Sequence, residues 1–148
     1  MTKNSVKPEL IDHIGFDLWR AAQAWKSAYE AEMVRRGFTW FGEARSSLVP
    51  HIPPDGIAQT LLVTKTGISK QAVQQHLDDL VRDGVVERVA DPADARRKIV
   101  RYTVKGVEAL DVANEVKREI EVRYSEQIGA DTIQTLRKAL SVIIEDQE

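Results

Sequence analysis

The amino-acid sequence predicts a mainly helical, α+β fold built as a single domain. The 148 residues, 43% of them apolar, are enough to bury one core. Apolar residues recur every three or four positions over most of the chain, which is typical of amphipathic helices. One segment, 85–104, instead has two short β-like runs, "VVERVA" and "RKIVRYTV", around the loop "DPADAR". That pattern predicts a β-hairpin.

The first predicted helix covers Leu10–Arg36, and Gly37 follows it where a left-handed cap is favoured. Thr39 is then expected to cap a second helix that runs to about Val49 and is stopped by Pro50. The prolines and the glycine of "PHIPPDG", residues 50–56, predict a loop. The apolar stripe of the first helix consists of Ile11, Ile14, Leu18, Ala22, Trp25, Tyr29 and Met33.

Two short helices joined by a glycine turn predict a helix-turn-helix. The first runs from Ile57 to about Thr66, Gly67 supplies the turn, and Ser69 is the N-cap of the second, which Gly84 closes. The residues expected to face inward are Ala58, Leu61, Leu62 and Val63 in the first helix and Ala72, Val73, Leu77, Leu80 and Val81 in the second. Asp78, Asp79 and Asp83 are expected to form a solvated face.

Two longer amphipathic helices are predicted after the hairpin, from Val107 to about Ile128 and from about Asp131 onward. We assign residues 38–104 to a central lobe and residues 9–36 and 107–146 to helices that join two copies in a homodimer. The reason is that these helices carry more apolar surface than one lobe can cover. The two later stripes are Leu110, Val116, Ile120 and Tyr124, followed by Leu136, Leu140, Ile143 and Ile144.

The positive charge of the chain is concentrated in the predicted hairpin. The whole sequence has 21 basic and 23 acidic residues. Between Asp91 and Lys105 there are five basic and two acidic residues, which leaves sixteen basic and twenty-one acidic residues elsewhere. A chain that is not basic throughout can bind nucleic acid only through such a local patch.

A helix-turn-helix followed directly by a hairpin with a basic tip is a winged helix. A characteristic set of residues runs through this segment: Ser69, then Leu80, Gly84, Val85, Val86 and Arg88, then Asp94, Ala95 and Arg96, and finally Tyr102, Thr103 and Gly106. With these residues the sequence resembles the MarR (multiple antibiotic resistance regulator) family, and the resemblance extends over nearly its whole length. The resemblance implies a dimeric, sequence-specific DNA-binding transcriptional regulator. It further implies a repressor that binds a palindromic operator in double-stranded DNA and responds to a small-molecule effector.

The chemistry of these segments predicts which residues contact DNA. The second helix of the motif would enter the major groove, where polar side chains at its start can reach base edges. These residues are Ser69, Lys70, Gln71, Gln74 and Gln75. At the hairpin tip, Arg96 is expected in the minor groove, braced by Asp94, while Arg97, Lys98 and Arg101 contact phosphates. Ser69 is equally a helix cap, and the alternative for the tip is a solvated, charged loop.

Several functional classes have no support in the sequence. It contains no cysteine, which excludes disulfides, thiolate metal sites and cysteine nucleophiles. His13, His51 and His76 lie in three different elements without the spacing of a metal site. No catalytic motif stands out, so we expect neither an enzyme nor a metal or other cofactor. The lack of a long apolar run or signal peptide predicts a cytoplasmic protein that does not enter a membrane.

Seven of the nine aromatic residues lie within the first 41 positions. We expect them to pack a core. The alternative, which the resemblance implies, is that Trp19, Trp40 and Phe41 line a pocket for a small aromatic ligand. For the chain as a whole, the alternative to a DNA-binding regulator is a winged-helix protein-interaction module without a specific DNA target, which the acidic remainder of the chain allows.

Overall fold

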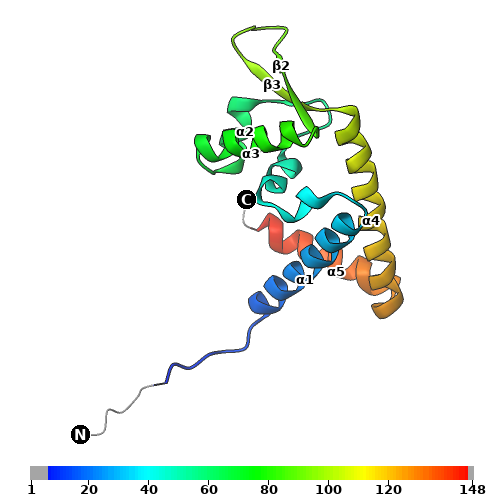
Figure 1. Ribbon diagram of the computed structural model, residues 1–148. Coiled ribbons are helices and arrows are strands. Elements are labelled where there is room, and N and C mark those ends of the chain that lie inside the picture. Colours follow the sequence, from blue (N-terminus) through cyan, green and yellow to red (C-terminus); the bar gives the residue numbers. More distant parts are fainter. Residues whose placement is uncertain (1–6, 147–148) are drawn as a thin grey trace, which may run out of the picture.

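The computed structural model describes residues 7–146 and has the mainly helical α+β architecture that the sequence predicts (Figure 1). The β2–β3 hairpin projects from one end of the molecule, and α4 runs from its base toward the turn into α5 (Figure 1). In chain order the elements, with η denoting a 3-10 helix, are α1 (Ile14–Arg35), η1 (Thr39–Gly42), η2 (Ala44–His51), β1 (Ile57–Ala58), α2 (Gln59–Thr66), α3 (Lys70–Arg82), β2 (Val86–Ala90), β3 (Lys98–Tyr102), α4 (Val104–Ile128) and α5 (Ala130–Glu145).

Three strands form a small antiparallel sheet in the order β1-β3-β2. The pairing of β2 with β3, which sets Val86 opposite Tyr102, confirms the predicted hairpin. The predicted helix start at Ile57 is wrong, because Ile57 and Ala58 form β1 and pair with β3. A strand of two residues shows no alternation, and its partner follows α2 and α3 in the sequence, so only the tertiary structure reveals it.

α1 begins at Ile14, later than the predicted start at Leu10. Leu10 and Ile11 precede it in a segment without regular structure, with 89% and 73% of their surfaces exposed. At the other end Gly37 has a φ of +98°, and its N–H donates to the carbonyl oxygen of Val34. The helix therefore closes on the left-handed glycine that the sequence predicts.

Residues 39–51 form two consecutive 3-10 helices, and the prediction of a single helix capped by Thr39 is wrong. Thr39 lies inside η1, and Pro50 lies inside η2 rather than ending it. The Ser46 hydroxyl lies 3.1 Å from the carbonyl oxygen of Phe41 and 2.8 Å from that of Glu43. Such local side-chain bonds compete with the hydrogen bonds of an α-helix, which accounts for the tighter turns.

Tyr102 of β3 fixes the proline-rich segment that follows η2. Its hydroxyl lies 2.9 Å from the carbonyl oxygen of Val49 and 3.0 Å from that of Ile52. Burial raises the pKa of Tyr102 to about 12, so the hydroxyl stays protonated and can donate to these carbonyl groups. The wing strand is thereby attached to the body of the lobe.

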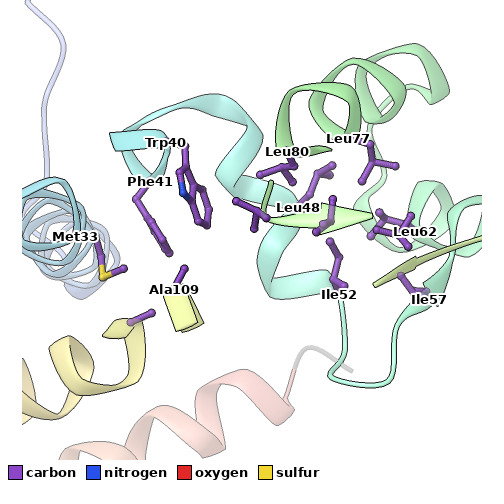
Figure 2. Packing of buried hydrophobic residues seen from close by; sticks show 14 of the residues in the cluster. Met33, Trp40, Phe41, Leu48, Ile52, Ile57, Leu62, Leu77, Leu80 and Ala109 are labelled. Atoms are coloured by element: carbon purple, nitrogen blue, oxygen red, sulfur yellow. The ribbon is translucent and has the colours of Figure 1, made fainter. Parts of the chain in front are cut away.

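One hydrophobic core joins the α1–α4 side of the molecule to the helix-turn-helix (Figure 2). Met33 of α1, Phe41 of η1 and Ala109 of α4 lie at one end of the cluster, and Leu62 of α2 and Leu77 of α3 lie at the other (Figure 2). This core holds α3 in place, and so it fixes the position of the polar face that α3 presents to solvent.

The predicted inward faces of α2 and α3 are confirmed for Leu62, Val73, Leu77 and Leu80, which are fully buried. They are wrong for Leu61 and Val81, which are 49% and 39% exposed. Leu61 precedes the fully buried Leu62, and Val81 follows the fully buried Leu80. Adjacent positions on a helix point about 100° apart. A short helix packed on one side cannot bury both.

α4 begins earlier than predicted because Thr103, rather than a residue near Val107, is its N-cap. The Thr103 Oγ1 accepts the N–H of Gly106 at 3.0 Å and donates to the carbonyl oxygen of Gly84. This brings the first turn of α4 so close to the chain after α3 that a Cβ on Gly106 would lie 2.0 Å from the Val85 carbonyl oxygen. Glycine is required here by close approach of two backbones.

Gly106→Ala should therefore destabilise the fold by about 3 kcal/mol, the upper end of the usual effect of overpacking, because the added methyl group meets backbone. Urea unfolding followed by circular dichroism measures the change. Gly15→Ala in α1 is the matched control, since its Cβ would meet only the flexible His13 side chain. We expect that control to gain up to about 1 kcal/mol from helix propensity. An unchanged unfolding midpoint for Gly106→Ala would contradict the close packing of α4 on the central lobe.

The apolar stripes of α1 and α5 are largely uncovered within one chain. Trp19 of α1 is 57% exposed, and Ile143 and Ile144 of α5 are 45% and 62% exposed. Met33 is the buried residue of α1, and Ile133 that of α5. Among residues 7–146, no helix combines the length and apolar character that a membrane span requires.

Candidate nucleic-acid interface

α3 presents a polar face to solvent because its apolar face is anchored in the core. Ser69 caps the helix as predicted, its Oγ accepting the N–H of Ala72 at 3.1 Å. Val73, Leu77 and Leu80 are fully buried. The predicted polar residues Lys70, Gln71, Gln74 and Gln75 are all exposed on the first turns of the same helix.

The three glutamines differ in what their amides contact. The Gln74 amide is bonded at both ends, to Gln59 at 2.5 Å and to Asp78 at 3.1 Å. The Gln75 amide donates to Asp79 across one turn at 3.4 Å, which is a long contact. Gln75 is thus held more loosely than Gln74.

The wing tip is a compact turn built around Asp91 and Asp94. The N–H of Asp91 donates to the carbonyl oxygen of Arg97. The N–H of Arg97 in turn donates to the carbonyl oxygen of Asp94. The Asp94 Oδ1 accepts both the backbone N–H of Arg96 at 3.0 Å and its Nε at 3.2 Å. These bonds from the Arg96 side chain and backbone hold the pKa of Asp94 below its usual value.

Arg96 is fully presented to solvent although it is held at its base. Its side chain is 91% exposed while paired with Asp94. The predicted bracing contact is therefore present in the structure. Such an anchored but exposed guanidinium at the end of a projecting hairpin is suited to enter a DNA groove next to the one that α3 would occupy.

The other three cations of the wing have different surroundings. The Arg101 Nε donates to Glu87 at 2.7 Å, directly across the β2–β3 pair. The Arg97 Nε lies 3.9 Å from Asp91, at the outer limit of an ion pair. Lys98 is exposed at the start of β3. The Arg101 guanidinium must leave or share the Glu87 carboxylate before it can contact a phosphate. Lys98 and Arg97 are therefore better placed for phosphate contacts.

A groove of about 380 Å³ lies between α3 and the wing, and we refer to it as the helix–wing groove. It brings the start of the recognition helix and the wing tip to one surface, with five basic side chains and no acidic one among its lining residues. The lining residues are Gln59, Thr60, Val63, Lys70, Gln74, Arg88, Arg96, Arg97 and Lys98. Such a concentration of positive charge attracts a polyanion.

A sequence profile of the MarR family matches residues 51–97, which include α2, α3 and the wing tip. The structure superposes on RV1404 from Mycobacterium tuberculosis with a TM-score of 0.75 and 20% identity, over 95% of this chain and 96% of that one. The winged helix-turn-helix segment of this chain is similar to the MarR family, and the fold of the chain is that of the MarR structures. The transcriptional repressor CouR bound to a 23-mer DNA duplex gives a TM-score of 0.69 at 26% identity, over 93% and 99% of the two chains. A MarR mutant from E. coli complexed with operator DNA gives 0.69 at 21% identity, over 88% and 92%.

No curated protein matches the sequence. The predicted resemblance and the winged helix-turn-helix fold are confirmed by the family profile and the structural matches. Because MarR-family proteins are transcriptional regulators, the prediction that the chain is not an enzyme is also confirmed.

Four residues of the helix–wing groove were not among the predicted site residues: Gln59, Thr60, Val63 and Arg88. Arg88 matches the MarR-family pattern, so its position after the recognition helix was a usable signal. Gln59 carries no local signal, because its contacts with Gln74 and Arg88 depend on how three elements come together.

The acidic face predicted on α3 is not simply solvated. Asp78 pairs with Arg88 of β2 at 2.8 Å, and Asp79 pairs with Arg82 at 3.0 Å. Asp83 pairs with Arg45 of η2 at 2.6 Å. Two of the three carboxylates thus connect α3 to other elements, which helical periodicity alone could not indicate.

The predicted ligand residues do not form one site within a single chain. Trp40 and Phe41 are buried, with ring centroids 4.0 Å apart, as the core-packing interpretation expects. Trp19 is exposed and stacks on Phe16. It lies about 20 Å along α1 from Met33, the residue that packs near Phe41 (Figure 2). No group of acidic and histidine side chains that could hold a metal occurs within residues 7–146.

Proposed function

We propose that this MarR-like protein is a homodimeric repressor that binds a palindromic operator in double-stranded DNA and is controlled by a small-molecule effector. The observation that carries the proposal is the helix–wing groove, where α3 and the wing present five cations on one surface. A protein with a net charge of −2 has no general reason to concentrate cations there.

In this proposal α3 lies in the major groove. Gln71 and Gln75 read base edges, and Lys70 contacts a guanine or a phosphate. The Ser69 Oγ already accepts the N–H of Ala72, so a phosphate at this helix start would be bound by the other backbone N–H groups of the first turn. The helix supplies the discrimination between sequences.

The wing supplies affinity in the same proposal. Arg96, braced by Asp94, enters the adjacent minor groove, whose negative potential attracts a guanidinium group. Arg97 and Lys98 contact phosphates, and Arg101 joins them when it leaves Glu87. These contacts fix the register of α3 on the duplex without reading sequence themselves.

The dimer follows from the uncovered stripes of α1 and α5. We assign residues 9–36 and 107–146 to the dimer interface and residues 38–104 to the DNA-binding lobe. A two-fold axis through the helices would set two copies of α3 about 34 Å apart, one turn of DNA, and this requires a palindromic operator. CouR, a transcriptional repressor bound to a DNA duplex, supports the DNA-binding part of this assignment by analogy.

The effector is proposed to bind where the dimer helices meet the lobe. Trp40 and Phe41 form the buried wall of this region, and Trp19 would reach it only from the partner chain in a dimer. Tyr29 of α1 packs edge-on against Phe41, with ring centroids 5.6 Å apart. An aromatic ligand seated there would change the angle between α1 and the lobe, and so the spacing of the two recognition helices.

Footprinting on DNA upstream of the protein's own gene, and on a genomic fragment library, tests the proposal. We expect protection of a site with two-fold symmetry whose halves are about one helical turn apart. Absence of any specific footprint would overturn it.

Gln75→Ala tests the role of the helix separately. The variant should bind its operator more weakly by about 1–3 kcal/mol for each half-site, the scale of one base contact, and should bind random-sequence DNA almost as the unmodified protein does. Fluorescence anisotropy with both duplexes at one salt concentration measures this. Equal losses on both duplexes would show that Gln75 contacts the DNA backbone and reads no base.

A further inference from the structure

Four side chains near the helix–wing groove form a closed ring of three hydrogen bonds and one ion pair, which we call the amide ring: Gln59, Gln74, Asp78 and Arg88. The Arg88 Nε donates to the Gln59 Oε1 at 3.1 Å, and the Gln59 Nε2 donates to the Gln74 Oε1 at 2.5 Å. The Gln74 Nε2 donates to the Asp78 Oδ1 at 3.1 Å. The Arg88 Nη2 closes the ring on the same oxygen at 2.8 Å.

Only one arrangement of donors and acceptors satisfies this ring. A guanidinium group can only donate and a carboxylate can only accept, so Arg88 and Asp78 fix the two ends of the chain of bonds. The Gln59 oxygen must therefore face Arg88, and the Gln74 amide nitrogen must face Asp78. Turning either glutamine amide over would set two donors or two acceptors against each other. The ring thus holds both glutamine side chains in one orientation.

The amide ring joins the three elements that meet at the DNA-facing surface. Gln59 is the first residue of α2, directly after β1, which pairs with β3 of the wing. Gln74 and Asp78 lie one turn apart on α3. Arg88 lies in the middle of β2, opposite Val100 of β3, and its side chain is only 21% exposed. The ring therefore attaches the recognition helix to the base of the wing.

Its position also limits what Gln74 can do. A bidentate contact to adenine needs the Oε1 as acceptor and the Nε2 as donor at once, in the plane of the base. In the ring one lone pair of the Oε1 and one hydrogen of the Nε2 are already engaged, and these two bonds fix the plane of the amide. Gln71 and Gln75, which are not ring members, are free of this constraint.

We propose that Gln59 is a positioning residue for DNA recognition, which acts through the amide ring to fix the angle between α3 and the wing. Gln74 belongs to the same device and reads no base. The proposal rests on the proposed DNA-binding function. It adds that base discrimination by α3 and insertion of Arg96 into the minor groove both depend on the angle between α3 and the wing, which Gln59 maintains.

The ring itself is tested on the DNA-free protein. In NMR spectra the Arg88 Nε–H should exchange slowly with water in the unmodified protein, because it donates to Gln59. Gln59→Leu should remove that protection, and Thr64→Leu, which adds a leucine to the exposed side of α2 outside the ring, should leave it in place. Equal exchange in the unmodified protein and Gln59→Leu would show that the ring does not form, whatever the protein binds.

The role of the ring is tested on a duplex selected by the unmodified protein from a random-sequence library. Gln59→Leu and Gln74→Leu should each weaken binding to that duplex by about three- to tenfold per half-site, the size of one net hydrogen bond. The double variant should lose no more than either single variant, because both break the same ring. Binding of each variant to single base-pair changes should show discrimination reduced at several positions of the half-site. Gln75→Leu is the comparator, and its loss should be confined to one or two positions.

Independent effects would overturn the proposal: a double variant whose loss equals the product of the two single losses, or a Gln74→Leu loss confined to a single base pair. The first would show that Gln59 does not act through Gln74, and the second that Gln74 reads a base. Failure of the unmodified protein to select any duplex would instead overturn the proposed function, while the exchange experiment would still report on the ring.

Discussion

Replacing Ile143 with Glu should separate the dimer into monomers or prevent it from folding. Ile143 lies on the uncovered stripe of α5 and is 45% exposed within one chain. If a second copy covers this stripe, the new carboxylate has no partner in an apolar interface. Burying an unpaired charge costs several kcal/mol, enough to shift a dimer of micromolar affinity to monomers. Light scattering coupled to size exclusion at micromolar concentration measures the mass.

Lys138→Glu is the control for this change, because it also introduces a carboxylate into α5 but at an exposed position off the stripe. That variant should keep twice the mass of the chain. A monomer mass for the unmodified protein, or a dimer mass for Ile143→Glu, would contradict the assignment of α5 to the interface.

Arg96→Ala should weaken binding to operator and to random DNA alike, since minor-groove and phosphate contacts at the wing carry little sequence information. Loss of one ionic contact in each half-site should also flatten the log–log dependence of affinity on salt by about one unit per half-site. Anisotropy titrations of both duplexes over a series of salt concentrations measure both effects. A loss restricted to the operator would show that Arg96 reads sequence.

Asp94→Ala separates bracing from simple charge at the same tip. Removing an anion near DNA should strengthen binding by charge alone. The Asp94 Oδ1, however, accepts both the backbone N–H and the Nε of Arg96, so its loss frees the guanidinium to leave the tip. We expect Asp94→Ala to weaken binding in the same direction as Arg96→Ala. A gain in affinity would show that Asp94 is only a turn residue.

The parts of the fold that were predicted correctly depend on local signals. The Ser69 cap, the left-handed cap at Gly37, the turn at Gly67 and the alternation of the hairpin all act within a few residues, so the sequence alone can predict them. The parts that were missed depend on distant partners. β1 is a strand only because it pairs with β3. Thr103 caps α4, in place of a residue near Val107, where its hydroxyl donates to the Gly84 carbonyl oxygen.

The same distinction between local signals and distant partners applies to the candidate site. Side chains on an exposed helical face or a hairpin tip could be named from periodicity and charge, and these include Gln75 and Arg96. The amide ring could not, because Gln59 and Gln74 meet only when α2 packs beside α3. The α1 and α5 stripes were predicted to be more than one lobe can cover, and the structure shows that they are exposed within one chain.

Our central proposal is that α3 and the wing, which flank the helix–wing groove, together bind DNA and discriminate between sequences. Its most direct test is the affinity of the full chain for an operator duplex and for a scrambled duplex of equal length, measured from low to high salt. We predict a log–log slope of about −5 to −7, for about six to eight phosphate contacts over two half-sites, and tighter operator binding by a factor of about 10³ or more at every salt concentration. Equal affinity for the two duplexes, or affinity that does not change with salt, would contradict the claim and favour a winged-helix module that binds another protein.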